Sequence, residues 1–398
     1  MKKYNKESKQ STVQLTLDQI VLEGARELLA KMLEEEITEH LGRLRYEHHN
    51  PGIEKKYRNG HGKERRLTVG SGSFPIRVPR LRVPYESQIV KRYQRYSDQI
   101  GQLFPQLYLH GLSTGDFQPV FSTLLGEHAP LSASTISRMK EQWQEEYKLW
   151  KNRKLDEEYL YVWADGVYPK AGPKDEQMAV LVVVGLNRKG EKELLAIEEG
   201  YRESYESWRD VLRNIHKRGA KWIGLVIGDG LPGFWRAIRD VYPRSKRQRC
   251  FVHKMRNILN NVPSKAQDEV QEALREMYHA RSLKEAQKLK DAFIFRYQRL
   301  YPKAILSLKE GAHLLFTYFS FPEKHWRSIK STNVIESMFS AVKLRTNVAR
   351  RIPKRESALY LVFKLLTDQQ TRFRKINGCR IVAHTIDSIR NSKKRIAA

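Results

Sequence analysis

The sequence predicts an α/β core that is interrupted by a large all-helical segment and preceded by a mainly helical, basic region. Residues 159–254 alternate apolar runs of strand length with amphipathic runs of helix length, which is typical of an α/β layer fold. Residues 255–325 show helical periodicity throughout. Lys and Arg exceed Asp and Glu by 73 − 45 = 28, and this excess is spread along all 398 residues rather than confined to a tail.

The α/β core begins with three strands in a meander. The run "QMAVLVVVGLN" is so continuously apolar that we expect it in the middle of the sheet. After the meander, helices and strands alternate. We expect strands at 159–167, 177–187, 192–200, 222–230 and 246–254, and helices at 204–219 and 231–243.

The segments that follow the core read as helices. We expect them at 265–280, 282–302, 303–319, 331–346 and 356–376, with a solvated basic tail at 391–398. In the helix at 331–346, four apolar residues form one stripe: Ile335, Met338, Phe339 and Val342. Glu336 lies at the edge of that stripe, and Asn333 with Glu336 has the spacing of a capping box.

The region before residue 150 combines helices with a basic hairpin. We expect a helix at 16–44 that starts with a Thr16–Gln19 capping box, and a short arginine-bearing hairpin around 76–78. Residues 111–150 read as a helix-turn-helix whose second helix turns Thr135 and Arg138 away from its apolar stripe, towards DNA. The alternative is a plain helical hairpin in a linker.

Composition narrows the class of partner. Such a net positive charge favours a polyanion, and its spread along the chain indicates an extended nucleic-acid track. A membrane partner is not expected, because the sequence has no run of 18 apolar residues, no basic amphipathic helix and no secretory signal. Two cysteines indicate a reducing compartment, and we expect a cytoplasmic protein.

Three carboxylates stand out by position. Asp165 and Asp229 each precede a glycine at the end of an apolar strand, and Glu336 comes from the late helix. Taken singly, the aspartates could form turns, Asp229 could cap the next helix, and Glu336 could belong to its capping box. Together, carboxylates from separate elements suit a hard divalent ion such as Mg²⁺, which promotes phosphoryl transfer.

The order of these carboxylates resembles that of the ribonuclease H-like DDE recombinases. The chain is more closely similar to the mutator-type transposases of bacterial insertion sequences. The matching stretches are "WADGVYPK", "RGAKWIGL", "GDGLPGFWRAI", "QRCFVHKMRN" and "FPEKHWRSIKSTNVIES", with "RNGHGKERRLTVGS", "IRVPR", "GLSTGDF" and "LSASTISR" before them. The match covers most of the chain, with several motifs in the family's order. One small departure is Ser331, where the family commonly has Thr; a hydroxyl for capping is kept.

The resemblance implies a ribonuclease H-like catalytic core in which Asp165, Asp229 and Glu336 form the catalytic triad and bind Mg²⁺, for which Mn²⁺ can substitute. It implies an all-helical insertion between Asp229 and Glu336. It also implies DNA partners, namely the terminal inverted repeats and the target, together with a homodimer and a circular excised intermediate. Lys343 matches the family's basic position after the glutamate, and we expect Lys343 and Arg345 to contact DNA phosphates.

Three other residues carry open alternatives. Cys250 and His253 match the family's Cys-x-x-His signature; they make half of a structural zinc site or support the active site, with His253 near the scissile phosphate. Trp326, expected in the loop before the late helix, is either a core aromatic or a base-stacking wedge at the cleaved DNA end.

These observations divide the chain into six expected segments. The segments are a helical and basic hairpin DNA-binding region (1–100), a helix-turn-helix (101–150), the first part of the core (151–254), the helical insertion (255–328), the catalytic helix (329–350), and C-terminal helices with a basic tail (351–398). The expected function is a DNA transposase. The alternatives are a non-catalytic DNA-binding regulator on a transposase-derived fold and a ribonuclease H-like nuclease.

Overall fold

The computed structural model describes residues 16–47, 56–112, 116–126, 133–172, 176–200, 202–348, 352 and 354–396. The chain forms two compact units, Met1–Met139 and Lys140–Ala398. The boundary between them falls inside helix α4 (Ala133–Lys151), not at its end. Within the described ranges, none of the helices combines the length and the apolar character that crossing a membrane would require.

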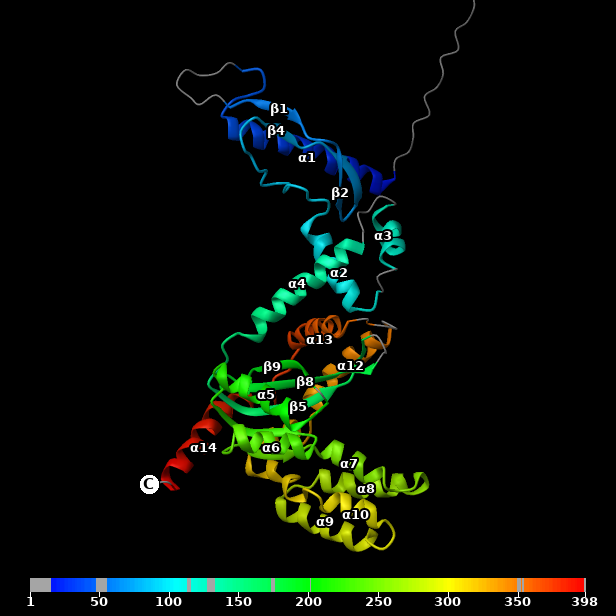
Figure 1. Cartoon of the computed structure of the whole chain (residues 1–398), viewed down its shortest axis with the longest axis vertical. Coiled ribbons are helices and arrows are strands. Elements are labelled where there is room, and N and C mark those ends of the chain that lie inside the picture. The colour runs from blue at the N-terminus through cyan, green and yellow to red at the C-terminus, as the bar shows by residue number, and fades with distance from the viewer. Residues whose placement is uncertain are drawn as a thin grey trace, which may run out of the picture. The chain divides into compact units, whose positions relative to one another are not determined.

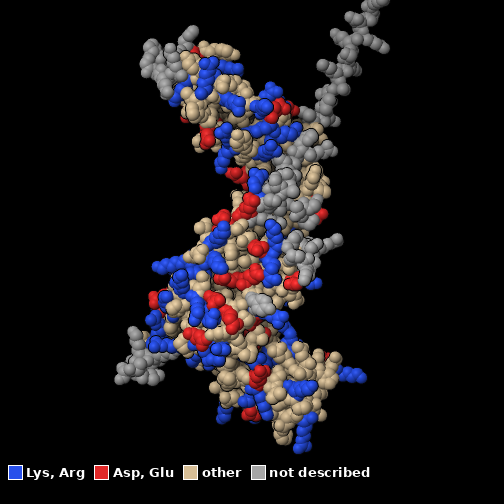
Figure 2. Space-filling view, in the orientation of Figure 1, with Lys and Arg blue, Asp and Glu red and all other residues tan. Residues whose placement is uncertain are grey.

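The N-terminal unit packs one long helix against short antiparallel strands. Helix α1 (Leu17–Leu41) starts with the predicted capping box. The Thr16 hydroxyl accepts a hydrogen bond from the Gln19 backbone N–H, and the Gln19 side chain accepts one from the Thr16 backbone N–H. The predicted hairpin is present as β2 (Arg65–Val69) and β3 (Gly72–Ile76), and β1 (Arg58–His61) pairs with β4 (Pro79–Leu81). Lys and Arg side chains crowd the visible face of this part of the chain (Figure 2).

Three helices follow the strands of the N-terminal unit. Helices α2 (Asp98–Leu109) and α3 (Phe117–Leu125) share a core of aromatic rings, with Phe104 packed against both Phe117 and Phe121. Helix α3 ends at Leu125, with Gly126 as its C-cap, and the next described element is α4. Two helices therefore flank the expected turn of the helix-turn-helix, whereas Pro130 and the rest of the turn lie outside the described residues.

The second unit is built on a five-stranded mixed sheet with strand order β11-β10-β5-β8-β9 (Figure 1). Its strands are β5 (Glu158–Val167), β8 (Ala179–Asn187), β9 (Lys192–Gly200), β10 (Trp222–Gly228) and β11 (Lys246–Arg249). Strands β5, β10 and β11 run parallel to one another, and β8 runs antiparallel to both of its neighbours, β5 and β9. All nine residues of β8 are buried. A separate two-residue ribbon pairs β6 (Lys170–Ala171) with β7 (Glu176–Gln177).

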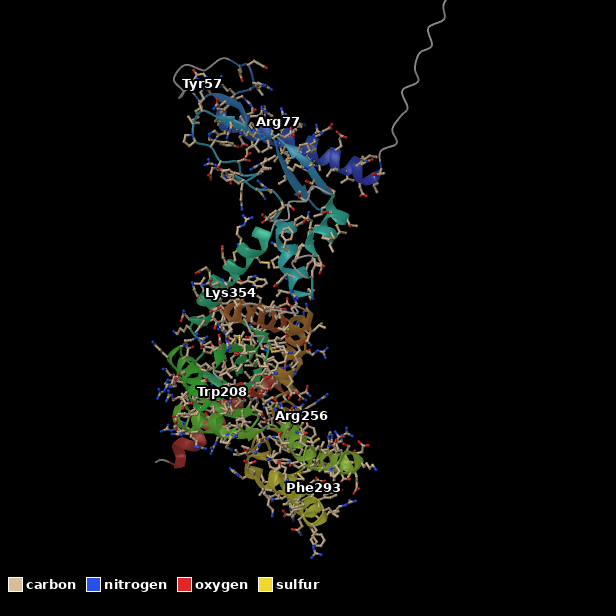
Figure 3. The ribbon with its side chains drawn as sticks, turned by 45° about the vertical axis from the view of Figure 1, so that its right-hand side comes forward. Tyr57, Arg77, Trp208, Arg256, Phe293 and Lys354 are labelled. Carbon is tan, nitrogen blue, oxygen red and sulfur yellow. The ribbon has the colours of Figure 1, made fainter. Side chains whose placement is uncertain are left out.

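Helices cover both faces of this sheet. Helices α5 (Tyr205–Lys217) and α6 (Pro232–Val241) pack on one face, where Trp208 of α5 is buried (Figure 3). The opposite face receives α11 (Glu323–Ile329), because Trp163 of β5 donates its Nε1 hydrogen to the main-chain oxygen of Ser328 at 3.0 Å. Because side chains alternate along a strand, Asp165 points to the same face as Trp163.

The segment between β11 and α11 is helical, as predicted. Helices α7 (Phe251–Leu259), α8 (Gln267–Tyr278), α9 (Leu283–Tyr297) and α10 (Pro302–Lys309) gather in one cluster, in which Figure 3 marks Phe293 of α9. The expected helix at 303–319 is shorter than predicted. It stops at Lys309, since Gly311 adopts a φ of 70°, and short 3₁₀ turns replace the remainder.

Three buried cations attach this helical cluster to the sheet. Arg249, Lys254 and Lys330 donate to the main-chain oxygens of Glu310, Ser307 and Tyr278, respectively. These oxygens lie at or next to the ends of α10 and α8, where carbonyl groups lack helical partners and the helix dipole favours positive charge. The cations therefore act as C-terminal caps supplied from outside the helices.

The chain ends in three helices, α12 (Asn333–Val348), α13 (Arg355–Gln370) and α14 (Val382–Ile396). Helix α12 packs on β5, and α13 packs on β9. The expected basic tail at 391–398 is helical as far as Ile396, because α14 continues through it.

Candidate active site

Asp165 lies inside strand β5 and not in a turn. Its backbone pairs with Val182 of β8, so the turn expected as one alternative is absent. The residue is 8% exposed, and its Oδ1 accepts a hydrogen bond from the Gly166 backbone at 2.9 Å. Burial, together with the nearby charges of Glu203, Asp229 and Glu336, raises the pKa of the Asp165 carboxyl to about 8.

Asp229 lies beside Asp165 because their strands are in register. Strands β10 and β5 run parallel with Ile227 opposite Trp163. Two residues further along the chain come Asp165, still in β5, and Asp229, directly after the end of β10. Neighbouring strands lie about 4.8 Å apart. Asp229 does not cap α6, because Leu231 occupies the N-cap position of that helix.

Glu336 comes from the first turns of α12, but not through the expected capping box. The Glu336 backbone nitrogen donates to the Thr332 oxygen at 3.0 Å, so Thr332 precedes the first turn and Asn333 is already helical. The Thr332 hydroxyl in turn donates to Glu336 Oε1 at 3.2 Å. The capping-box alternative is therefore wrong, and the carboxylate is held at the helix start by a threonine.

His253 connects the second and third carboxylates. Its Nδ1 lies 3.7 Å from Asp229 Oδ1, and its Nε2 lies 3.4 Å from Glu336 Oε1. The expected strand at 246–254 is wrong beyond Arg249, because Cys250 caps a helix. The Cys250 sulfur accepts the His253 backbone N–H at 3.5 Å, which starts α7 and turns His253 towards the carboxylates.

Cys250 is fully buried beneath His253. Its sulfur also accepts hydrogen bonds from the Thr332 backbone and hydroxyl, so it joins the start of α7 to the start of α12. One potential ligand atom from each of Cys250, His253 and Glu336 lies within 4.8 Å of the others. Burial raises the pKa of the Cys250 thiol to about 11, which opposes the thiolate form that a zinc ion requires.

The basic residues expected on α12 have different environments. Lys343 is exposed, about 10 Å along the helix axis from Glu336 at 1.5 Å per residue. Arg345 is only 3% exposed, so its guanidinium is not presented to DNA in this conformation, and its phosphate contact stays a prediction. In the N-terminal unit, Arg138 is exposed on α4; Thr135 lies in the first turn of α4, and its side chain is outside the described part.

Trp326 lies on helix α11 and not in a loop. Its indole N–H donates to the Phe321 oxygen at 2.8 Å, and its ring packs edge-on against Phe319 at 4.8 Å between centroids. The half-buried indole also lines a cavity of about 780 Å³ beside Lys246. Lys246 begins β11, three residues before Arg249, so the cavity lies towards the end of β11 that is remote from Asp229. Packing in the aromatic cluster accounts for much of this tryptophan's environment.

Glu203 was not predicted from the sequence. Strand β9 runs in the same direction as β5, so it ends at the same edge of the sheet, and Glu203 follows that end by three residues. The Tyr168 hydroxyl donates to its carboxylate. Burial raises the pKa of the Glu203 carboxyl, as does the charge of Asp229. The missed signal is an acidic residue just after the third strand of a meander.

Comparison with known proteins gives a consistent set of relatives. The sequence matches the family described as Transposase, Mutator family, over residues 2–376. It is 40% identical over 285 residues to the transposase for insertion sequence element IS6120 of Mycolicibacterium smegmatis, which covers 71% of this chain and 88% of that protein. The transposase for insertion sequence element ISRM5 of Rhizobium meliloti (strain 1021) is 32% identical over 375 residues, or 94% of this chain and 92% of that protein.

Proposed function

Because this chain belongs to the Mutator family of transposases, we propose that it binds the inverted ends of its own insertion sequence and catalyses metal-dependent DNA strand cleavage and strand transfer. The observation that carries this proposal is the convergence of three carboxylates from separate elements. Asp165 and Asp229 come from neighbouring parallel strands, and Glu336 comes from a helix joined to Asp229 through His253.

The donor set fits a hard divalent cation. Mg²⁺ and Mn²⁺ prefer carboxylate oxygens, and Asp165 supplies one from a buried position. Among the described residues, Oδ1 of Asp165 accepts one hydrogen bond, from Gly166, and Oδ2 accepts none. A cation there would offset the burial and the charge repulsion that together raise the pKa of this carboxyl. We therefore assign Asp165, Asp229 and Glu336 as ligands of Mg²⁺, which would activate the attacking oxygen and stabilise the leaving one.

The protein's own groups then have distinct roles. His253 orients the Asp229 and Glu336 carboxylates from its position between them, and Cys250 and Thr332 fix the two helix starts from which His253 and Glu336 project. Lys343, exposed two turns beyond Glu336, is placed to hold a DNA phosphate. The arrangement of strands, with one antiparallel strand between two that run the same way, supports a ribonuclease H-like core with an inserted helical segment.

DNA binding rests on charge and on the N-terminal unit. The net charge of +28 supplies a sequence-independent attraction to DNA phosphates. We propose that Arg138 and Thr135 on α4 read bases at the element's ends, and that target DNA is bound by the same protein, acting as a homodimer. The regulator alternative is less well supported, since a non-catalytic protein has no need to keep three convergent carboxylates.

The test is a cleavage assay with the full-length chain. The substrate is a duplex that carries the inverted repeats flanking the gene, incubated with Mg²⁺ or Mn²⁺. Asp165→Asn, Asp229→Asn and Glu336→Gln should each abolish cleavage while binding of the ends stays within about threefold, because phosphate and groove contacts are made elsewhere. Binding without cleavage by the unmodified protein would support the regulator. Equal cleavage of DNA that lacks the repeats would support the nuclease.

A further inference from the structure

We propose that Glu203 is a fourth carboxylate ligand of the divalent-ion site. This inference rests on the proposed function and adds to it a residue outside the Asp165, Asp229 and Glu336 triad. Glu203 lies in the short connection between β9 and α5, directly before Ser204, which caps α5 through a hydrogen bond from the Ser207 backbone.

The topology of the sheet brings Glu203 to the edge of the sheet where Asp165 and Asp229 lie. Strand β8 reverses direction after β5, and β9 reverses it again, so the ends of β5 and β9 lie on the same side of the sheet. The register agrees, because β8 pairs Leu181 with Gly166 of β5 and pairs Ala179 with Gly200 of β9. Glu203 follows Gly200 by three residues and therefore starts from the edge where Asp165 and Asp229 lie.

Gly166 provides the closest contact. A Cβ atom at this position would lie 2.4 Å from Glu203 Oε1, so the glutamate carboxylate occupies the space that any other side chain would fill. Gly166 lies inside a paired strand and is not among the glycines with positive φ, so its backbone conformation does not require glycine. The absence of a side chain is instead explained by the Glu203 carboxylate packed over it. Because side chains alternate along β5, Gly166 faces the α5 side of the sheet, so Glu203 approaches the end of β5 from that side, next to the residue that carries the Asp165 carboxylate.

The carboxylate of Glu203 is oriented by a tyrosine. Tyr168, three residues after Asp165, donates its hydroxyl hydrogen to Glu203 Oε1. Trp208 is a second hydrogen-bond partner of this carboxylate. An ionised carboxylate accepts about four hydrogen bonds or metal bonds in all, so two partners leave room for a metal ion.

A fourth ligand changes what the site can hold. Two ions about 4 Å apart share bridging and terminal oxygens, and three carboxylates provide few oxygens for both. Asp165 lies between Asp229 on one side and Glu203 on the other, since the first comes from β10 and the second follows β9. Glu203 would therefore add its carboxylate oxygens to those of Asp165, Asp229 and Glu336.

The experiment measures ion binding directly. Full-length protein is titrated with Mn²⁺, and free Mn²⁺ is followed by electron paramagnetic resonance, with and without DNA ends. We expect Glu203→Gln to weaken one class of Mn²⁺ sites at least tenfold and to raise the Mg²⁺ concentration for half-maximal cleavage by a similar factor, while DNA binding is unchanged. Glu206→Gln is the matched control, because Glu206 is an exposed glutamate in the first turn of α5.

A second variant tests the geometry without removing a carboxylate. Gly166→Ala should displace Glu203 and weaken Mn²⁺ binding in the wild-type background, but should have little further effect when Glu203 is already alanine. Mn²⁺ binding and Mg²⁺ requirement within twofold of wild type in both Glu203→Gln and Gly166→Ala would overturn the inference. Asp165→Asn separates the two levels: if it loses ion binding and Glu203→Gln does not, only Glu203 is misassigned. If Asp165→Asn also keeps the wild-type Mn²⁺ binding and Mg²⁺ requirement, the assignment of the metal site itself is wrong.

Discussion

The imidazole Nε2 of His253 lies 3.4 Å from Oε1 of Glu336. The same ring reaches Asp229 through Nδ1, so one side chain restrains carboxylates that are 107 residues apart in sequence, 336 − 229. Side chains that orient metal ligands typically contribute about 10- to 100-fold to metal affinity or activity.

We therefore expect His253→Ala to slow DNA cleavage by about 10- to 100-fold, without abolishing it, because the three proposed ligands remain. The cleavage rate is measured at saturating Mg²⁺, with DNA binding in parallel. His279→Ala is the control, since His279 caps the end of α8 within the helical insertion. A wild-type rate for His253→Ala would mean that the histidine only fills space.

Asp165 predicts how stability depends on pH. Its pKa is about 8 in the folded protein, against about 4 in an unfolded chain, so the folded state binds more protons between these values. Its contribution to stability is therefore complete below pH 4 and is lost as the pH rises through 8. Asp165→Asn should raise the melting temperature of the metal-free protein by about 5 °C or more at pH 8.5, where the buried carboxyl is ionised, because each kcal/mol of stability corresponds to about 2–4 °C. At pH 4 the increase should be much smaller.

Mg²⁺ provides the complementary measurement. An ion that binds only the folded state stabilises it, and it would do so most where Asp165 is ionised. Calorimetry at pH 8.5 should show Mg²⁺ raising the melting temperature of the wild-type protein but not of Asp165→Asn. Equal stabilisation of both proteins by Mg²⁺ would place the ion elsewhere.

Lys343 and Arg345 should respond differently to substitution. Lys343→Ala removes an exposed charge, so it should weaken DNA binding and reduce the slope of log K against log salt by about 1, with an unchanged melting temperature. Arg345→Ala removes a buried side chain and should lower the melting temperature first. Salt-dependent binding and thermal unfolding of both variants check this contrast, and the reverse pattern would contradict it.

Arg138 is expected to carry sequence preference and not general affinity. Arg138→Ala should lower the preference for the element's ends over random DNA by a factor that corresponds to about 1–3 kcal/mol. Competition binding with the full-length chain measures this ratio. Equal losses on both DNAs would show that Arg138 contacts only phosphates and that base reading lies elsewhere.

Lys254 should matter for the attachment of the helical insertion. Its ammonium group is buried and donates to the Ser307 oxygen at the end of α10. Lys254→Ala would leave that carbonyl without this donor, and a lost buried partner costs about 1–3 kcal/mol. Relative to the wild-type protein, we expect Lys254→Ala to speed amide exchange in α9 and α10 more than in α5, as measured by hydrogen–deuterium exchange. Uniform exchange across the unit would indicate global destabilisation instead.

Local patterns were sufficient to predict much of this molecule. Strands β5, β8, β9 and β10 and the helices that cover them follow from apolar periodicity, and Asp165 and Asp229 were singled out by an Asp-Gly pair behind an apolar run. The α/β core and its helical interruption were predicted correctly. The ribonuclease H-like classification and the metal remain predictions.

The errors arose where distant residues decide local structure. Residues 250–254 have aromatic and β-branched side chains that suit a strand, but Cys250 caps a helix and is held there by Thr332, 82 residues later. Arg345 appeared to be a surface cation, because charge patterns along a helix do not reveal what packs over it. Glu203 was missed because its nearness to Asp165 depends on two reversals of strand direction.

The helical insertion also sets the order in which the parts of a growing chain are completed during synthesis. Residues up to Met139 form their own compact unit, and they leave the ribosome well before Glu336. The last proposed ligand arrives only after the whole insertion has been made, and the carbonyl caps from Arg249, Lys254 and Lys330 require that insertion to be folded. An unfinished chain therefore carries the N-terminal unit, which we propose binds DNA, before it carries the complete set of carboxylates that we propose cuts DNA.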